Sequence, residues 1–80
     1  MKARVHIRLK PGVHDPQGRA IGNALHGLGF GEVGEVRQGK LIELDIEAAD
    51  AASARARLDE MGRQLLANPV IETYAIDLDG

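Results

Sequence analysis

The first segment of the chain, KARVHIRLK at residues 2–10, alternates without a break between apolar side chains and charged or polar ones. Successive side chains of a β-strand point to opposite faces, so the pattern predicts a strand with one buried face and one exposed, basic face. The predicted buried face consists of Ala3, Val5, Ile7 and Leu9. A strand with a single apolar face must pack against a second layer, and the chain has only 80 residues from which to build it.

The segment PGVHDPQG, residues 11–18, is expected to end the strand, turn the chain and enter a helix. Asp15 followed by Pro16 is typical of a helix N-cap with proline in the first turn. Apolar residues then recur at helical spacing and predict a helix over residues 16–28 with one apolar stripe. The stripe consists of Ala20, Ile21, Ala24, Leu25 and Leu28. Gly22 and Gly27 weaken such a helix by up to about 1 kcal/mol relative to Ala, a cost that close approach to another surface could offset.

Two further strands are predicted in GEVGEVRQGKLIELDIE, residues 31–47. We expect them to form a hairpin whose turn is Gln38-Gly39-Lys40, because Gly39 could supply the positive φ of a tight turn. In the second of these strands alternate residues are apolar and should face the core, namely Ile42, Leu44 and Ile46. The residues between them, which should face outward, are all acidic: Glu43, Asp45 and Glu47.

The second half of the chain predicts one more helix and one more strand. Asp50 is a candidate N-cap for a helix that runs to about Leu66 and is ended by Asn68-Pro69. The expected inner stripe of this helix is Ala51, Ala54, Leu58, Met61 and Leu65. The final segment, VIETYAIDL at residues 70–78, predicts a half-buried strand with Tyr74, Ile76 and Leu78 on one face.

The resulting order is β-α-β-β-α-β in a single domain over residues 1–80. Right-handed crossovers would place both helices on one face of a four-stranded sheet, which is a two-layer α+β sandwich of the ferredoxin-like type. The basic strand and the acidic strand would be central neighbours. A chain of this length buries only about 60% of the surface it exposes when unfolded. With one Phe, one Tyr, no Trp and no Cys, such a core gains from oligomerisation or a partner.

The charge is small overall but uneven along the chain. A net charge of −2 gives no general attraction to nucleic acids or anionic membranes. Residues 1–40 hold seven Lys or Arg against three acids, a net +4, whereas residues 41–80 hold three against nine, a net −6. The N-terminus lacks the apolar stretch of a signal peptide, and no run is long enough to span a bilayer, so we expect a cytoplasmic protein that is not bound to membranes.

One glycine motif suggests nucleotide binding but stands in the wrong context. GFGEVG at residues 29–34 matches G-x-G-x-x-G, which binds a pyrophosphate only where it follows a strand and opens a helix. Here it follows a predicted helix and precedes a predicted strand. We therefore interpret Gly29 as the residue that closes the helix in the left-handed conformation, and we expect Phe30 to fold back into the core.

Other chemistries are also disfavoured. His6, His14 and His26 do not have the spacing of a metal-ligand set, and the chain has no Cys. Ser53 is the only serine, and no catalytic triad can be assembled around it. RNA-recognition modules with the same element order stack bases on aromatic side chains of the sheet, whereas the corresponding positions here are charged. The sequence thus predicts neither a catalytic residue nor a metal site, and no nucleic-acid partner.

Three stretches of the chain form an ordered set: DPQGRAIGNALHGLGF at residues 15–30, VRQGKLIELDIE at 36–47 and LLANPVIETYAIDL at 65–78. Together they resemble the PurS family, the small subunit of phosphoribosylformylglycinamidine (FGAM) synthase, and the resemblance covers essentially the whole chain. The resemblance implies a non-catalytic subunit in purine biosynthesis, with PurQ and PurL as partners. PurQ would release ammonia from glutamine, PurL would bind ATP and magnesium, and the small subunit would assist ammonia transfer. It also implies a homodimer or homotetramer, and no cofactor bound by this chain.

The resemblance also implies a set of candidate interface residues. Asp15, Gln17 and Gly18 match the helix-entry motif of the family, and Arg37, Gly39 and Lys40 match its hairpin. Helix capping and backbone freedom explain Asp15 and the glycines without any partner. Two exposed cations at a hairpin tip stabilise nothing evident, so Arg37 and Lys40 are candidates for contact with a partner. The alternative function is a regulatory module of the ACT type, which shares this element order and binds amino acids between paired domains.

Overall fold

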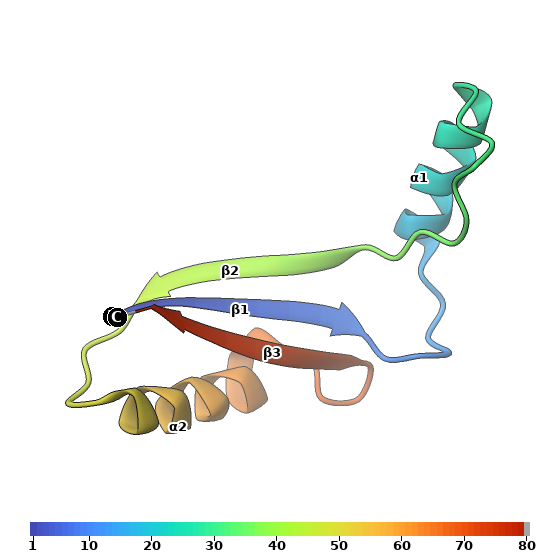
Figure 1. Cartoon of the computed structure of the whole chain (residues 1–80). Coiled ribbons are helices and arrows are strands. Elements are labelled where there is room, and N and C mark those ends of the chain that lie inside the picture. The colour runs from blue at the N-terminus through green and yellow to red at the C-terminus, as the bar shows by residue number, and fades with distance from the viewer. Residues whose placement is uncertain (80) are drawn as a thin grey trace.

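The computed structural model describes residues 1–79 as an α+β fold with one antiparallel sheet (Figure 1). The elements are β1 (Lys2–Leu9), α1 (Pro16–Gly27), β2 (Gly39–Asp45), α2 (Ala51–Met61), a π-helical turn η1 (Gly62–Leu66) and β3 (Glu72–Asp79). The sheet formed by these residues has three strands in the order β2-β1-β3. Both neighbours of β1 run antiparallel to it.

The core lies between the sheet and α2. The inward residues of β1, namely Ala3, Val5 and Ile7, are at most 1% exposed, and Ala54 and Leu58 of α2 are fully buried. Partly buried apolar side chains from both flanking strands surround them, including Ile42, Leu44, Tyr74, Ile76 and Leu78. The predicted inward faces of the three strands are therefore confirmed. Only this register buries every apolar residue of the alternating pattern, since a slip by one residue would turn each to solvent.

The outer face of the sheet places basic and acidic residues side by side, as the sequence predicted. Arg4 of β1 is paired in register with Glu43 of β2 and with Asp77 of β3. Its guanidinium donates a hydrogen bond of 2.8 Å to Asp79. Exposed ion pairs contribute little to stability, so this pattern mainly favours the observed strand register.

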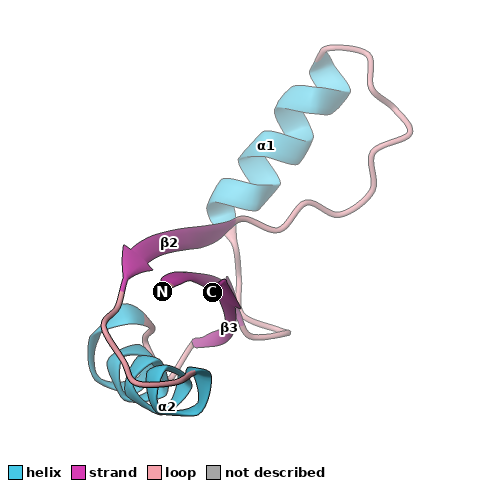
Figure 2. Cartoon of the chain, turned by 60° about the vertical axis from the view of Figure 1, so that its left-hand side comes forward, coloured by secondary structure: helices cyan, strands magenta, loops and turns pink. Residues whose placement is uncertain are grey.

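The first helix does not pack on the sheet. Together with residues 28–38, α1 forms an arm that projects from one end of the sheet, whereas α2 lies under the sheet (Figures 1 and 2). The molecule measures 50 × 26 × 14 Å, with a radius of gyration of 15.9 Å. A compact chain of this length would have a radius of about 12 Å. The expectation that both helices cover one face is therefore wrong for the isolated protomer.

The predicted hairpin is also absent. Residues 31–38 pair with no strand of the described chain, and Gly39 and Lys40 begin β2 instead of forming a turn. The reason is that residues 31–38 return along α1. Val36 packs directly against the helix, since a Cβ built on Gly22 would lie only 3.4 Å from Cγ2 of Val36. The segment thus packs against the helix of the arm and not against β2, which leaves three strands in place of the expected four.

The helix ends are partly as predicted. Gly29 has a φ of +101°, which confirms that it closes α1 in the left-handed region. Phe30 is 49% exposed, since α1 has no core beneath it, and its predicted burial is wrong. Asp50 caps α2 by accepting a hydrogen bond of 2.7 Å from the Ser53 amide. The π turn η1 then alters the helical spacing, so Leu65 is 83% exposed and does not continue the buried stripe.

Candidate functional site: the arm junction

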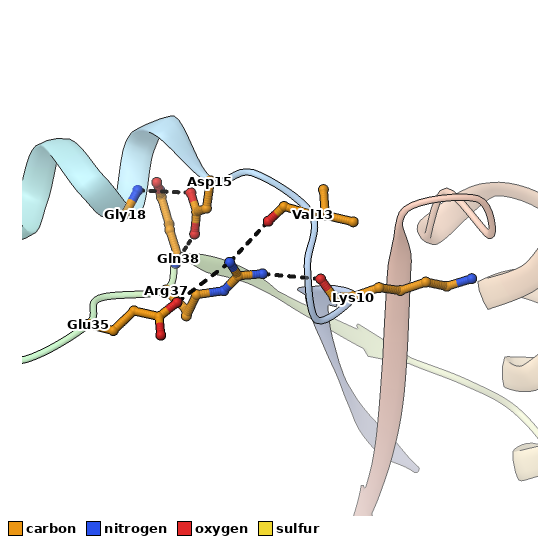
Figure 3. A network of polar contacts seen from close by, with 7 residues as sticks. All are labelled: Lys10, Val13, Asp15, Gly18, Glu35, Arg37 and Gln38. Carbon is orange, nitrogen blue, oxygen red and sulfur yellow. Dashed lines mark hydrogen bonds and ion pairs between the residues drawn. The ribbon is translucent and has the colours of Figure 1, made fainter.

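Three of the six predicted site residues, Asp15, Gly18 and Arg37, lie at the junction where the chain enters and leaves the arm (Figure 3). Asp15 stands at this crossing and is only 8% exposed. One of its carboxylate oxygens, Oδ1, accepts a hydrogen bond of 2.8 Å from the Gly18 amide, and Oδ2 accepts one of 2.7 Å from the Gln38 amide. A single carboxylate thus caps α1 and ties the returning segment to it. The hydrogen bond from Gly18, and then that from Gln38, lowers the pKa of Asp15.

Arg37 joins the same two chain segments. Its Nη1 donates to the Val13 carbonyl at 3.0 Å and its Nη2 to the Lys10 carbonyl at 3.2 Å. The Glu35 carboxylate lies 3.8 Å from Nη1. The planar guanidinium can bridge two carbonyls because its donors are held in a fixed fork. The interpretation of Arg37 as a cation at a hairpin tip is therefore wrong, because the side chain binds the entering segment of its own junction.

Two glycines allow the segments to approach closely. A Cβ on Gly18 would lie 2.4 Å from the Val36 carbonyl oxygen, and one on Gly39 would lie 2.6 Å from the Ile7 carbonyl oxygen. Neither glycine has a positive φ. The sequence predicted that these glycines serve the backbone conformation, whereas the structure shows that they are needed for space.

Gln17 and Lys40 lie beside the junction and line a cavity of about 280 Å³ together with Glu72. The ammonium of Lys40 is 3.4 Å from Oε2 of Glu72, whose side chain is 11% exposed. The other oxygen of Glu72 accepts a hydrogen bond of 2.7 Å from the Asn68 amide. This hydrogen bond, and then the charge of Lys40, lowers the pKa of Glu72. Lys40 therefore connects the first residues of β2 and β3 across the sheet.

The six predicted residues are thus all brought to one region, and the interactions between them are structural. Asp15, Gly18 and Arg37 connect the two segments of the junction, and Gly39 lets β2 start against β1. Sequence reasoning missed Gln38, which takes part through its backbone amide and so leaves no side-chain signal. The arrangement fixes where the arm leaves the sheet.

A larger concavity of about 750 Å³ opens between the arm junction and the outer face of the sheet. Its lining is rich in cationic or ionisable side chains, among them His6, Arg8, Arg37 and Lys40. Within residues 1–79, no group of three or more His, Asp or Glu side chains is placed to hold a metal ion. Over the same residues, no helix has the length and apolar character needed to cross a bilayer.

A second polar cluster fixes η1 against β3. The hydroxyl of Tyr74 donates to Oδ1 of Asp59 at 2.5 Å, and Arg63 pairs with the same carboxylate. The hydrogen bond lowers the pKa of Asp59 and raises that of Tyr74. A Cβ on Gly62 would lie 2.8 Å from the Tyr74 ring, so a glycine is required where the π turn meets the strand.

Comparison with known proteins finds relatives over the whole chain. Residues 2–80 match the family model described as "PurS: Phosphoribosylformylglycinamidine (FGAM) synthase". The PurS subunit of Synechocystis sp. is 48% identical over 75 residues, which cover 94% of this chain and 75% of the relative. A solved relative is Methanocaldococcus jannaschii PurS, one of the subunits of formylglycinamide ribonucleotide amidotransferase in the purine biosynthetic pathway. Its crystal structure matches this chain with a TM-score of 0.90 at 44% identity, and the match covers 98% of this chain and 94% of that chain.

A further solved structure is that of PurLQS from Thermotoga maritima. One of its chains has a TM-score of 0.88 to this protein at 30% identity, with 95% of this chain and 93% of that chain covered. The coverage in these comparisons includes the arm as well as the sheet.

Proposed function

Because the chain belongs to the PurS family of FGAM synthase subunits, we propose that it assembles with PurL and PurQ as the small, non-catalytic subunit of that enzyme in purine biosynthesis. The observation that carries the proposal is the likeness, over nearly the whole chain, to a protein solved within PurLQS. The same family match favours this function over the ACT-type regulatory module.

In the proposed complex each subunit has a separate task. PurQ releases ammonia from glutamine, and PurL binds ATP and magnesium and joins the ammonia to formylglycinamide ribonucleotide. This chain bridges the two enzymes in the cytoplasm and assists the passage of ammonia between them. The charged groups of its junction are bonded to one another and to the backbone, which supports a role in positioning surfaces.

The six junction residues contribute to this role in two ways. Asp15, Gly18, Arg37 and Gly39 hold the arm in its direction, and the exposed side chains of Gln17 and Lys40 are available to contact a partner or a second copy. The proposed function includes self-association as a homodimer or homotetramer. A complete ferredoxin-like sandwich with four strands would then be a property of the assembly and not of the protomer.

The proposal can be tested by reconstitution with PurL and PurQ from the same organism. FGAM formation is measured with glutamine as the nitrogen source and, separately, with an ammonium salt. We expect the chain to raise the glutamine-dependent rate and to leave the ammonium-dependent rate nearly unchanged, because free ammonia needs no transfer between subunits. An equal glutamine-dependent rate with and without the chain would show that the proposed function is wrong.

A further inference from the structure

The outer face of the sheet, which lies opposite the face covered by α2, divides into two halves of unlike charge (Figure 1). In the half around the start of β1, each cation has acids beside it on the neighbouring strands. The partners in register are Asp45 and Asp79 for Lys2, and Glu43 and Asp77 for Arg4. Two cations and four acids leave this half with a net charge of −2. This half therefore supplies the counter-charges of its own cations.

The half around the end of β1 has cationic and ionisable side chains without acids. The neighbours in register are Leu41 and Ala75 for His6, and Gly39 and Thr73 for Arg8. His6 and Arg8 are both exposed. Within residues 1–79 neither of them forms an ion pair. We call this half of the face the cationic end, since no carboxylate of the neighbouring strands offsets its charge.

The larger concavity, of about 750 Å³, opens over the cationic end. The side chains of its lining that matter here are His6, Arg8, Arg37, Lys40 and Leu41. Glu35 also lines it, but this carboxylate lies 3.8 Å from Nη1 of Arg37 and is the only acid against three permanent cations. Leu41 is 53% exposed and adds an apolar surface beside His6. The concavity thus combines an excess of positive charge with one large apolar side chain.

This arrangement fits an acidic polypeptide better than a compact anion. The outward residues of β1 are spaced by about 7 Å along the strand, so their charges form a row. The guanidinium of Arg37 is held by the Val13 and Lys10 carbonyls, and therefore does not turn toward a common point with Arg8. A phosphate group would also leave Leu41 without an apolar contact. A segment with acidic side chains along its length and an apolar one between them matches both features.

We propose that the cationic end docks an acidic segment of one of the two partner enzymes, PurL or PurQ. Carboxylates of the segment pair with Arg8 and with the ammonium of Lys40, which remains 62% exposed beside Glu72, and an apolar side chain covers Leu41. The proposal rests on the proposed function for the identity of the partners, and it assigns the surface that meets one of them. The acidic half of the same face repels such a segment, so the charge pattern also fixes where along the sheet the partner lies.

The first test is a titration of the full chain with a probe peptide, followed by nuclear magnetic resonance at low salt. In the peptide, which is acetylated and amidated, three glutamates alternate with two leucines. We expect the amide shifts to change at residues 6–8 and 39–41 and not at residues 2–4 and 43–45. Inorganic pyrophosphate, a compact anion, should bind more weakly. Shifts confined to other residues, or binding of pyrophosphate as tight as that of the peptide, would overturn the proposal.

Two matched variants test the role of the charge. Arg8→Gln and Lys2→Gln each remove one positive charge from the outer face of β1, at positions about 20 Å apart. We expect Arg8→Gln to weaken peptide binding by about tenfold or more, as the loss of a charged hydrogen bond does. Lys2→Gln should stay within about twofold of the wild type, because salt screens charges over this distance. Arg8→Lys keeps the charge and should retain most of the affinity. Equal weakening by Arg8→Gln and Lys2→Gln would contradict a site at the cationic end.

The same variants are then measured against PurL and PurQ separately, from the same organism. Arg8→Gln should lower the affinity for one of the two by about tenfold and reduce its dependence on salt, because an interfacial charge pair is lost. Lys2→Gln should bind both as the wild type does. The mass of each variant alone, from sedimentation equilibrium, should equal that of the wild type. If Arg8→Gln changes this mass, a second copy covers the cationic end and the proposal is wrong.

Failure of the docking site and failure of the proposed function give different results, because the peptide titration needs neither enzyme. A chain that binds the peptide at the cationic end but does not raise glutamine-dependent synthesis overturns the proposed function and with it the identity of the partner. A chain that raises this synthesis, with Arg8→Gln bound as tightly as the wild type to both enzymes, overturns only the docking site.

Discussion

Replacing Gly18 by alanine should disrupt the arm junction, although alanine normally stabilises a helix. The added Cβ would lie 2.4 Å from the Val36 carbonyl oxygen and 2.7 Å from Oδ2 of Asp15. Real Cβ atoms essentially never approach another atom within 3.0 Å, so the returning segment would have to move by at least 0.6 Å. That segment is joined to Asp15 through the Gln38 amide, and the displacement would strain this hydrogen bond.

The size of the effect follows from two opposing contributions. Alanine gains up to about 1 kcal/mol over glycine within a helix, because glycine loses more backbone entropy on folding. Forcing an extra methyl group into a closely packed contact costs about 1–3 kcal/mol. Gly27 lies in the same helix with no atom within 4 Å of its Cβ position, so Gly27→Ala keeps the gain without the clash. The helix gain is common to both variants and cancels, so we expect Gly18→Ala to be less stable than Gly27→Ala by about 1–3 kcal/mol, the cost of the close contact.

Urea unfolding followed by circular dichroism measures this difference. Hydrogen exchange at residues 33–38 should show in addition that the Gly18→Ala variant loosens the returning segment before the sheet unfolds. The close packing described for the junction is wrong if the two variants have the same free energy of unfolding and if the amides of residues 33–38 exchange equally slowly in both.

Three further predictions concern the junction and the cluster on β3. The amide resonances of Gly18 and Gln38 should titrate together with a midpoint below pH 3.8, because their hydrogen bonds lower the pKa of Asp15 in the folded protein. The stability that Asp15 contributes is lost as the pH falls through this folded-state pKa. A midpoint at or above pH 3.8 would contradict the prediction. The ultraviolet absorbance of Tyr74, the only tyrosine, should show ionisation above pH 10.0, because the Asp59 hydrogen bond raises its pKa. The stability that Tyr74 contributes is fully present below pH 10.0 and is lost as the pH rises through its folded-state pKa. A midpoint of ionisation at or below pH 10.0 would refute the hydrogen bond between Tyr74 and Asp59. Arg37→Lys should broaden the distribution of distances between spin labels on α1 and β2, because an ammonium group lacks the planar, forked donors that bridge the Val13 and Lys10 carbonyls. An unchanged distribution would show that Arg37 does not fix the arm.

Local patterns were sufficient to predict the strands of the sheet and the helix starts. The alternation in residues 2–10, 40–46 and 72–78 identified which residues face the core, because one slip in register would expose all of them. Asp15 and Asp50 identified the helix starts, because an N-cap bonds only to residues a few positions ahead.

The place of α1 could not be predicted in the same way. Its apolar stripe would suit its own sheet or another surface equally well, and the pattern of residues 31–37 does not say whether the segment pairs with a strand or packs along the helix. The close contact of Gly18 and Gly22 with Val36 decides that the segment follows the helix, and this contact is visible only in three dimensions. The exposure of Leu65 was missed for a related reason, since the π turn depends on Gly62 meeting the Tyr74 ring from another element.

The most direct test of the account is the sedimentation of this chain mixed with PurL and PurQ from the same organism under turnover conditions, with ATP, magnesium and glutamine present. A subunit of FGAM synthase should sediment with both partners as one species heavier than any of the three alone. If the chain instead sediments as it does by itself while PurL and PurQ turn over glutamine normally, its proposed place in the complex is contradicted.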